Sequence, residues 1–259
     1  MNKPPIRILS NLARAGGTLV SKCLGAMDNI VLLSEIHPLG TQLFNPLAQA
    51  HDWYKLIQLE ETRGQYNFLD AIQLIEQRCR DSGKTLIIRD WAHLDFIGRP
   101  FIEKPSYKLQ LIDALAPAFD LGRFSLVRHP VDQWISTSRL KIMQGQLTLD
   151  IFLAGYRRFA EQSIKTGFMR FEDFTHEPAQ QMKRLCEHLN INYDPGFINR
   201  WQANTRITGD TSKMSRGSRM NEIRPLVKHT VENSLMVKFR NNSDYQQAIE
   251  LLGYADTAT

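Results

Sequence analysis

An arginine, a pair of glycines and a threonine near the start of the chain have the residue types and spacing of an anion site. The segment Arg14-Ala15-Gly16-Gly17-Thr18 follows the aliphatic run Ile6–Ser10 and continues into Leu19, the start of an apolar, helix-like stretch. Glycines let the backbone turn several N–H groups toward one point, and a helix N-terminus adds free N–H groups and positive partial charge. With the charge of Arg14 and the hydroxyl of Thr18, this segment predicts a site for phosphate or sulfate.

The segment is not a Walker A motif. That motif needs Gly, four residues and then Gly-Lys-Ser/Thr, and Thr18 stands where its lysine would be. The Gly-Lys-Thr at residues 83–85 lacks the first glycine, and we expect Gly83 to end a helix before a strand. Taken alone, the Gly16-Gly17 turn is equally well explained as an ordinary strand–turn–helix connection.

Arg128 and Ser136 form a second possible anion site. Arg128 ends the apolar run that starts at Phe124, and Pro130 suits the first turn of a following helix that also carries Ser136. An arginine fork and a hydroxyl can meet on one phosphate. Taken alone, this segment favours a surface ion pair and an exposed hydroxyl.

The elements that must position these residues alternate along the chain. Aliphatic, strand-like runs are separated by helical patterns, which predicts right-handed crossovers and a mainly parallel five-stranded sheet in a three-layer α/β/α fold. Ligands of such sheets bind beyond the carboxyl ends of the strands, which directs attention to Glu35, His37, Asp90, His93 and Arg128. The predicted strands are Ile6–Ser10, Ile30–Ser34, Thr85–Arg89, Phe124–Arg128 and Phe168–Phe171, and the predicted helices between them are Thr18–Ala26, Thr41–Leu59, Phe68–Asp81, Ser106–Phe119, Val131–Met143 and Leu149–Ile164.

We expect one domain over residues 1–259. It would have a core of about residues 5–175 and a more helical region over about 176–259, with predicted helices at Pro178–Leu189, Gly196–Ala203 and from Asn221 onward. The segment Thr205–Arg219 is rich in small, polar and basic residues and is predicted to be a loop that is ordered either by itself or by a ligand.

The composition of the chain limits the partners, metal sites and cellular location that we expect for it. The chain has 42% hydrophobic and 23% charged residues, a net charge of +5 and three widely spaced cysteines. The basic residues are scattered along the chain, and no nucleic-acid-binding signature occurs. We therefore rank nucleic acid last among the expected partners, behind an anionic cofactor or an acidic substrate. The cysteines are expected to be buried thiols, and no Cys/His spacing indicates a metal. No leader-like or membrane-spanning run occurs, so we expect a cytoplasmic protein.

Taken together, the two anion-binding segments resemble the sulfotransferase family that uses 3′-phosphoadenosine 5′-phosphosulfate (PAPS). That family has a strand followed by Pro-Arg/Lys-Ser-Gly-Thr-Thr, to which Ala13–Thr18 is similar. It later has a strand ending in Arg-(His/Asn)-Pro with a serine eight residues after the arginine, the spacing of Arg128-His129-Pro130 and Ser136. Residues 171–189 also resemble a Tyr-Glu-Asp-Leu…Pro…Leu-Cys-x-Phe-Leu stretch of bacterial members. The resemblance covers about residues 5–220 and implies a fold of the P-loop NTPase and sulfotransferase type.

The resemblance also implies residue roles. The cofactor-binding residues would be Arg14, Ala15, Gly16, Gly17, Thr18 and Leu19 around the 5′-phosphosulfate, Arg128 and Ser136 at the 3′-phosphate, and Arg216 and Gly217 in a basic loop near the C-terminus. The chain departs from the family at Ala13, Ala15 and Gly17, which removes two hydroxyl donors from the first loop.

The implied reaction is sulfuryl transfer to a hydroxyl or amine, with Arg14 beside the transferring group and a general base to take the acceptor's proton. Glu35, 21 residues after Arg14, resembles the base of tyrosylprotein sulfotransferases, and His93 is the runner-up, after the histidine of cytosolic members. Arg89-Asp90 resembles a Lys-Asp pair in the tyrosylprotein group. The segment 37–64 is expected to select the acceptor, whose identity the sequence does not give. Two other classes stay open, a P-loop-type phosphotransferase and a non-catalytic nucleotide-binding protein.

Overall fold

Five parallel strands form one sheet in the computed structural model, which describes residues 3–209, 222–227 and 229–256. Their order across the sheet is β2-β3-β1-β4-β5, so the chain moves to one side of β1 first and to the other side later. Such a change of direction opens a crevice at the carboxyl ends of the strands, here beside β1. The strands are β1 (Pro5–Asn11), β2 (Ile30–Ile36), β3 (Thr85–Asp90), β4 (Asp120–Val127) and β5 (Phe168–Arg170).

The sequence of the strands explains why they lie inside. In β1, Ile6, Ile8 and Leu9 are fully buried, because a parallel sheet covered by helices hides both faces of its central strands. Leu9 pairs with Arg89 of β3 on one side and with Phe124 of β4 on the other. This register brings the carboxyl ends of the three strands to one edge, where the predicted site residues follow.

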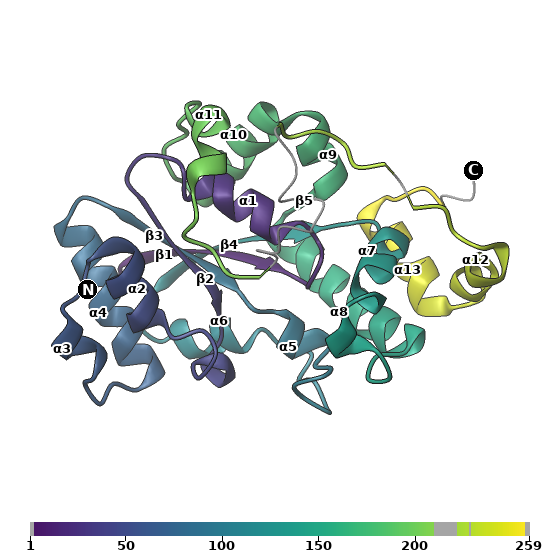
Figure 1. Ribbon diagram of the computed structural model, residues 1–259, viewed down its shortest axis with the longest axis horizontal. Helices are drawn as coiled ribbons and strands as arrows, with labels where there is room; N and C mark the ends of the chain where they lie inside the picture. The colour runs from purple at the N-terminus through teal and green to yellow at the C-terminus, as the bar shows by residue number, and fades with distance from the viewer. Residues whose placement is uncertain (1–2, 210–221, 228, 257–259) are drawn as a thin grey trace.

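Helices cover both faces of the sheet (Figure 1). On one face α1, α10 and α11 pack with Leu9, Leu32 and Ile87. On the other face α2, α4 and α6 pack with Ile8 and Leu33. The helices are α1 (Gly17–Leu24), α2 (Pro46–Tyr54), α3 (Leu59–Thr62), α4 (Phe68–Asp81), α5 (His93–Phe96), α6 (Gln110–Leu115), α7 (Pro130–Ser138), α8 (Leu149–Thr166), α9 (Phe171–His176), α10 (Pro178–Leu189), α11 (Phe197–Arg200), α12 (Asn233–Arg240) and α13 (Ser243–Leu252), with 3₁₀ turns η1 (Pro38–Gly40), η2 (Lys141–Met143) and η3 (Trp201–Ala203).

The three-layer α/β/α prediction is confirmed, and all five strands are parallel. Several helix boundaries were wrong. The helix predicted over Thr41–Leu59 is only α2, because the Asn45 side chain caps its start and Lys55, at φ 54°, ends it. Of the helix predicted over Ser106–Phe119 only α6 forms. Asn221, where the last helical region was predicted to begin, lies outside the described residues, and the described residues 222–227 and 229–232 are not helical, so this region starts with α12 at Asn233. Gly83 does end α4 in the left-handed conformation, at φ 66°.

The three cysteines are buried and unpaired, as predicted. Burial raises the pKa of the Cys79 and Cys186 thiols to about 12, so both stay protonated at neutral pH. Within the described ranges, no helix has the length and apolar character needed to cross a membrane. Among the residues that the structure describes, no three or more His, Cys, Asp and Glu side chains are grouped so that they could hold a metal ion.

Candidate active site

The loop between β1 and α1 adopts the conformation that its glycines allow. Gly16 has φ 95° and is the N-cap of α1, so no side chain covers the N–H groups of the first helical turn. Arg14 also has a positive φ of 66°, which is uncommon outside glycine and is found where the surrounding structure fixes a functional group.

Both glycines of this loop are also required by close packing. A Cβ atom on Gly16 would collide with the Phe171 ring, and one on Gly17 would collide with the side chain of Asn11. A side chain at either position would therefore displace the loop or its neighbours. Both glycines are therefore explained by packing within the protein, and the anion-binding role of the loop stays a prediction.

The two predicted anion-binding segments meet in space. The Arg14 Nε donates to Ser136 Oγ at 2.9 Å, and the Arg128 Nη1 donates to the Arg14 carbonyl at 3.1 Å. Arg128 is buried and its guanidinium lies 5.5 Å from the centroid of the Phe171 ring. Residues 114 to 122 positions apart thus form one cluster of two cations and a hydroxyl.

Hydrogen bonds from neighbouring elements hold this cluster. The Tyr156 hydroxyl of α8 donates to the Arg128 carbonyl at 2.6 Å, and the Gln133 side chain of α7 donates to the Ala13 carbonyl at 2.7 Å. The Glu172 carboxylate accepts from the His129 N–H at 2.9 Å and from the Tyr254 hydroxyl at 2.9 Å. The backbone that carries Arg128 is therefore fixed from three sides.

Glu35 lies at a bulge near the end of β2. The pairing with β3 shifts register between Ser34 and Ile36, and Glu35 takes a φ of 58°. A bulge re-aims a side chain and is common beside active sites. Here it brings the Glu35 carboxylate to 3.3 Å from the Arg89 guanidinium, and the Glu35 side chain is 21% exposed.

Arg89 connects the Glu35 side of the site to the glycine loop. Its Nη1 is 3.4 Å from Thr18 Oγ1, and its Nη2 donates to the Thr208 carbonyl at 3.0 Å. Burial lowers the pKa of the Arg89 guanidinium and the nearby Glu35 raises it, but arginine keeps its charge in proteins. A buried cation is costly unless it is paired, so this one holds Glu35 and Thr18 at fixed positions.

His93 does not join this cluster. It is the first residue of α5, it is buried, and its Nε2 bonds the Arg99 carbonyl at 2.8 Å. Burial lowers its pKa to about 4. The His37 side chain is also fully buried, with its Nε2 3.2 Å from the Asp95 carboxylate. Both histidines hold the loops after β2 and β3.

Asp90 is buried and is not exposed in the site. Ser10 donates to its carboxylate at 3.0 Å, and burial together with the nearby Asp95 raises its pKa well above the usual range. Two further predicted site residues, Arg216 and Gly217, lie outside the described residues. Just before them, Gly209 approaches both halves of the site, since a Cβ there would lie 3.1 Å from Glu35 Oε1 and from Thr18 Oγ1.

Sequence reasoning missed several residues that build the site. In the sequence, Phe171, whose ring packs against Gly16 and Arg128, is only the end of a predicted strand and the start of a segment that resembles the family, and Asn11 lies just after the predicted strand Ile6–Ser10. Thr208 lies in a segment that was predicted to be a loop, and its hydroxyl is 2.8 Å from the hydroxyl of Ser34. Only knowledge of the strand order brings these residues together.

Comparison with known proteins agrees with this geometry. A model of the sulfotransferase family matches residues 5–195. The chain belongs to the sulfotransferase family. Membership makes the protein a transferase of sulfuryl groups and implies a sulfuryl donor. A comparison with curated protein sequences found no match.

The fold of this sulfotransferase is similar to two solved sulfotransferase domains. One is from the olefin synthase of Synechococcus PCC 7002, with 15% identity, a TM-score of 0.63, and coverage of 98% of this chain and 97% of the other. The second is from the curacin biosynthetic pathway, with 17% identity, a TM-score of 0.62, and coverage of 98% and 99%. At this identity the likeness concerns the fold.

Proposed function

We propose that this sulfotransferase uses PAPS as its donor and transfers the sulfuryl group in line to an acceptor hydroxyl or amine, with Glu35 as the general base. The observation that carries the proposal is the meeting of Arg14, Arg128 and Ser136 beside the glycine loop. This cluster joins two cations from different segments of the chain, the glycine loop and the end of β4, which suits a donor that carries two phosphate groups.

The residues of the site fit such a donor. The close-packed Gly16-Gly17 loop and the α1 N-terminus would hold the 5′-phosphosulfate, with Thr18 and Arg14 beside it. Arg128 and Ser136 would hold the 3′-phosphate by charge-assisted hydrogen bonds. The donor supplies the activated sulfuryl group, whose S–O bond to the phosphate breaks as the acceptor oxygen or nitrogen bonds to sulfur.

The remaining work falls to side chains of this chain. Glu35 takes the proton of the acceptor, and Arg89, 3.3 Å away, fixes the direction in which its carboxylate points. Arg14 offsets the negative charge that gathers on the leaving phosphate. Glu35 is preferred to His93 as base because the Glu35 side chain is partly exposed beside Thr18 and Arg89, whereas His93 is buried and its Nε2 is used by Arg99.

A thermal-shift comparison of nucleotides tests the donor. Adenosine 3′,5′-bisphosphate, the product of transfer, should stabilise the protein by about 2.7 kcal/mol at a hundredfold excess over its Kd, or roughly 5–10 °C in Tm. Adenosine 5′-monophosphate is the matched control, since it lacks only the 3′-phosphate, and should give a smaller shift. Stabilisation by ATP with Mg²⁺ and not by the bisphosphate would favour the phosphotransferase alternative and overturn the proposal.

A further inference from the structure

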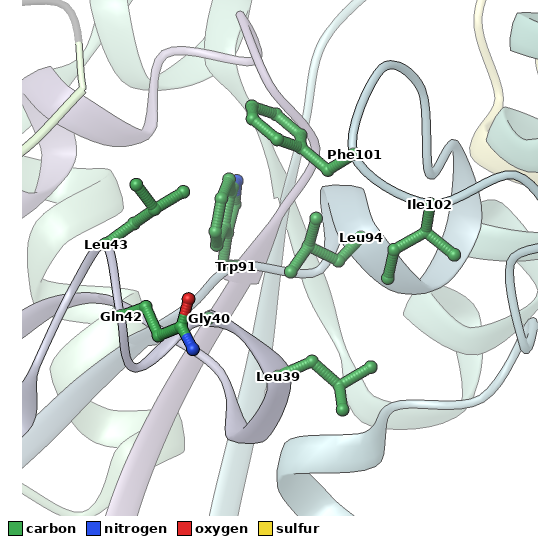
Figure 2. A pocket seen from close by; sticks show the side chains of 8 residues that line it. All are labelled: Leu39, Gly40, Gln42, Leu43, Trp91, Leu94, Phe101 and Ile102. Carbon is green, nitrogen blue, oxygen red and sulfur yellow. The ribbon is translucent and has the colours of Figure 1, made fainter.

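An apolar groove opens at the same end of the sheet as Glu35. Figure 2 shows Trp91 at its centre, with Leu43 on one side of the ring, Phe101 above the ring, Leu94 and Ile102 on the other side, and Leu39 below. Its volume is about 190 Å³. Gln42 contributes a polar group, and none of the lining residues that the structure describes is charged.

The groove is joined to the proposed base through backbone bonds. The Trp91 N–H donates to the carbonyl of Ile36, the residue that follows Glu35, at 3.2 Å. Trp91 is also two residues after Arg89, the partner of Glu35. Leu39 and Gly40 belong to η1, which begins three residues after Glu35. The carboxylate and the groove are therefore built on the same two strand ends.

The floor of the groove is a fixed aromatic surface. The Trp91 ring packs edge-to-face against Phe44, with centroids 5.0 Å apart, and against Phe101, at 5.1 Å. A Cβ on Gly40 would lie 2.8 Å from the Trp91 ring, so a glycine here lets η1 pack directly on it. The rim is different, because Leu39 and Leu43 are 62% and 63% exposed.

We propose that this groove holds the apolar body of the acceptor, and that the acceptor is an uncharged alcohol or phenol about the size of one aromatic ring. The inference rests on the proposed function, since it takes Glu35 as the base. A cavity of about 150 Å³ is known to hold benzene, so the observed volume suits a single ring or a short alkyl chain of similar bulk. A charged acceptor would lose its hydration in this groove without gaining a partner.

The exposed rim also explains how such an acceptor enters. Large apolar side chains left open to water beside a reactive group mark a ligand surface more often than a structural one. A bound ring would cover Leu39 and Leu43 and remove apolar area from water on both partners. Glu35 is not a lining residue of the groove, so the inference requires the hydroxyl of the bound acceptor to extend from the groove to the end of β2, where Glu35 lies.

Binding of acceptors can be measured without any donor. Quenching of tryptophan fluorescence by 4-nitrophenol, at a pH low enough to keep this phenol protonated, should saturate, and it should be largely lost in Trp91→Phe if the signal comes from this groove. Leu43→Asp should weaken binding by about tenfold or more, the scale of a lost apolar contact in a binding pocket. Val237→Asp is the matched control, since Val237 is 52% exposed on α12 and is not a lining residue of the groove; it should bind like the parent protein.

A series of acceptors then tests the chemistry. In transfer assays, phenol and cyclohexanol should have KM values at least about tenfold below those of 4-hydroxybenzoate and glucose, and 2-naphthol should bind more weakly than phenol because it exceeds the groove. Equal use of charged or sugar acceptors, or no effect of Leu43→Asp on KM, would overturn the inference. Unweakened binding of 2-naphthol and longer alkylphenols would instead mark a docking surface for a larger acceptor.

The two proposals fail in different ways. If the bisphosphate stabilises the protein but 4-nitrophenol does not bind, the groove inference falls and the donor assignment stands. If 4-nitrophenol binds in a Leu43-dependent manner but the bisphosphate gives no thermal shift, the donor assignment falls. Leu43→Asp should leave the bisphosphate shift unchanged, because Leu43 is outside the residues proposed to hold the donor.

Discussion

The two ends of the site differ in how they are made. The end proposed to bind the donor, between the β1–α1 loop and the start of α7, is polar and cationic, and hydrogen bonds with Tyr156, Gln133 and Glu172 fix its backbone. The acceptor end, after β2 and β3, joins one bulge carboxylate to apolar walls such as Trp91. Recognition of phosphate needs fixed donors and charge, whereas recognition of an apolar acceptor needs only surface of the right shape. Short sequence motifs can therefore indicate the residues proposed for the donor end, but they cannot indicate those proposed for the acceptor end.

The sharpest test of this division is Glu35→Gln, since Glu35 is the polar group on which the acceptor end depends. Loss of a positioned base typically lowers the rate by about 10²–10⁴. Transfer between 4-nitrophenyl sulfate and the bisphosphate, followed by release of 4-nitrophenolate, measures this loss, while the thermal shift with the bisphosphate should be nearly unchanged. A Glu35→Gln enzyme that keeps most of its activity, beside an inactive His93→Ala, would move the base to the histidine.

Arg128→Ala should break the donor end and spare the acceptor end. The guanidinium makes charge-assisted hydrogen bonds, so its loss should weaken bisphosphate binding by roughly 1.5–3 kcal/mol, measured by calorimetry. Arg139→Ala, at the C-terminal cap of α7, the helix that follows Arg128, is a control for loss of one positive charge. Unchanged bisphosphate affinity in folded Arg128→Ala would contradict the assignment of the 3′-phosphate.

The pH dependence of stability tests whether His93 is a structural residue of the acceptor end. Its pKa is about 4 in the folded protein, because burial opposes the charge, and about 6.5 when unfolded. The unfolded state therefore binds the extra proton between these values, and stability falls as pH is lowered from about 6.5 toward 4. Between pH 7 and pH 5 the contribution is about 2 kcal/mol.

Urea unfolding at both pH values measures this contribution. His93→Gln keeps a side-chain amide near the Arg99 carbonyl and cannot titrate, so the stability difference between pH 7 and pH 5 should shrink by that amount. Buried Asp90 acts in the opposite direction, since its raised pKa lowers stability as pH rises above 4, and it is present in both proteins. An unaltered pH difference in His93→Gln would mean that the pKa of His93 is the same in the folded and unfolded protein, so that burial does not shift it.

The smallest effect should come from Ser136→Ala. The hydroxyl accepts from the Arg14 Nε, and a neutral hydrogen-bonding group contributes about 0.5–1.5 kcal/mol. Bisphosphate affinity should fall a few-fold, and the Arg128→Ala, Ser136→Ala double variant should show coupling between the two changes. Strict additivity in calorimetry would place the two side chains on different groups of the ligand.

The residues proposed for the donor end could be picked out from the sequence because each part of that proposal is local. A strand, a glycine pair and a helix start lie within residues 5–24, and Arg128-His129-Pro130 with Ser136 spans nine residues. Hydrophobic runs also predicted all five strands, since buried parallel strands are nearly continuous in apolar residues. Helix ends between residues 41 and 62 were missed because capping by Asn45 and the left-handed Lys55 outweighed the apolar pattern.

The amino-acid sequence alone therefore determined the strand–helix alternation, the family resemblance and the residues proposed to bind the donor. The tertiary structure decided which of the other candidates reach the site. It brought Arg89 to Glu35 and buried His93 against Arg99, and it assembled the Trp91 groove from three separated segments. The physical reason is that strand order and loop packing set these contacts, and both depend on interactions between residues far apart in the chain.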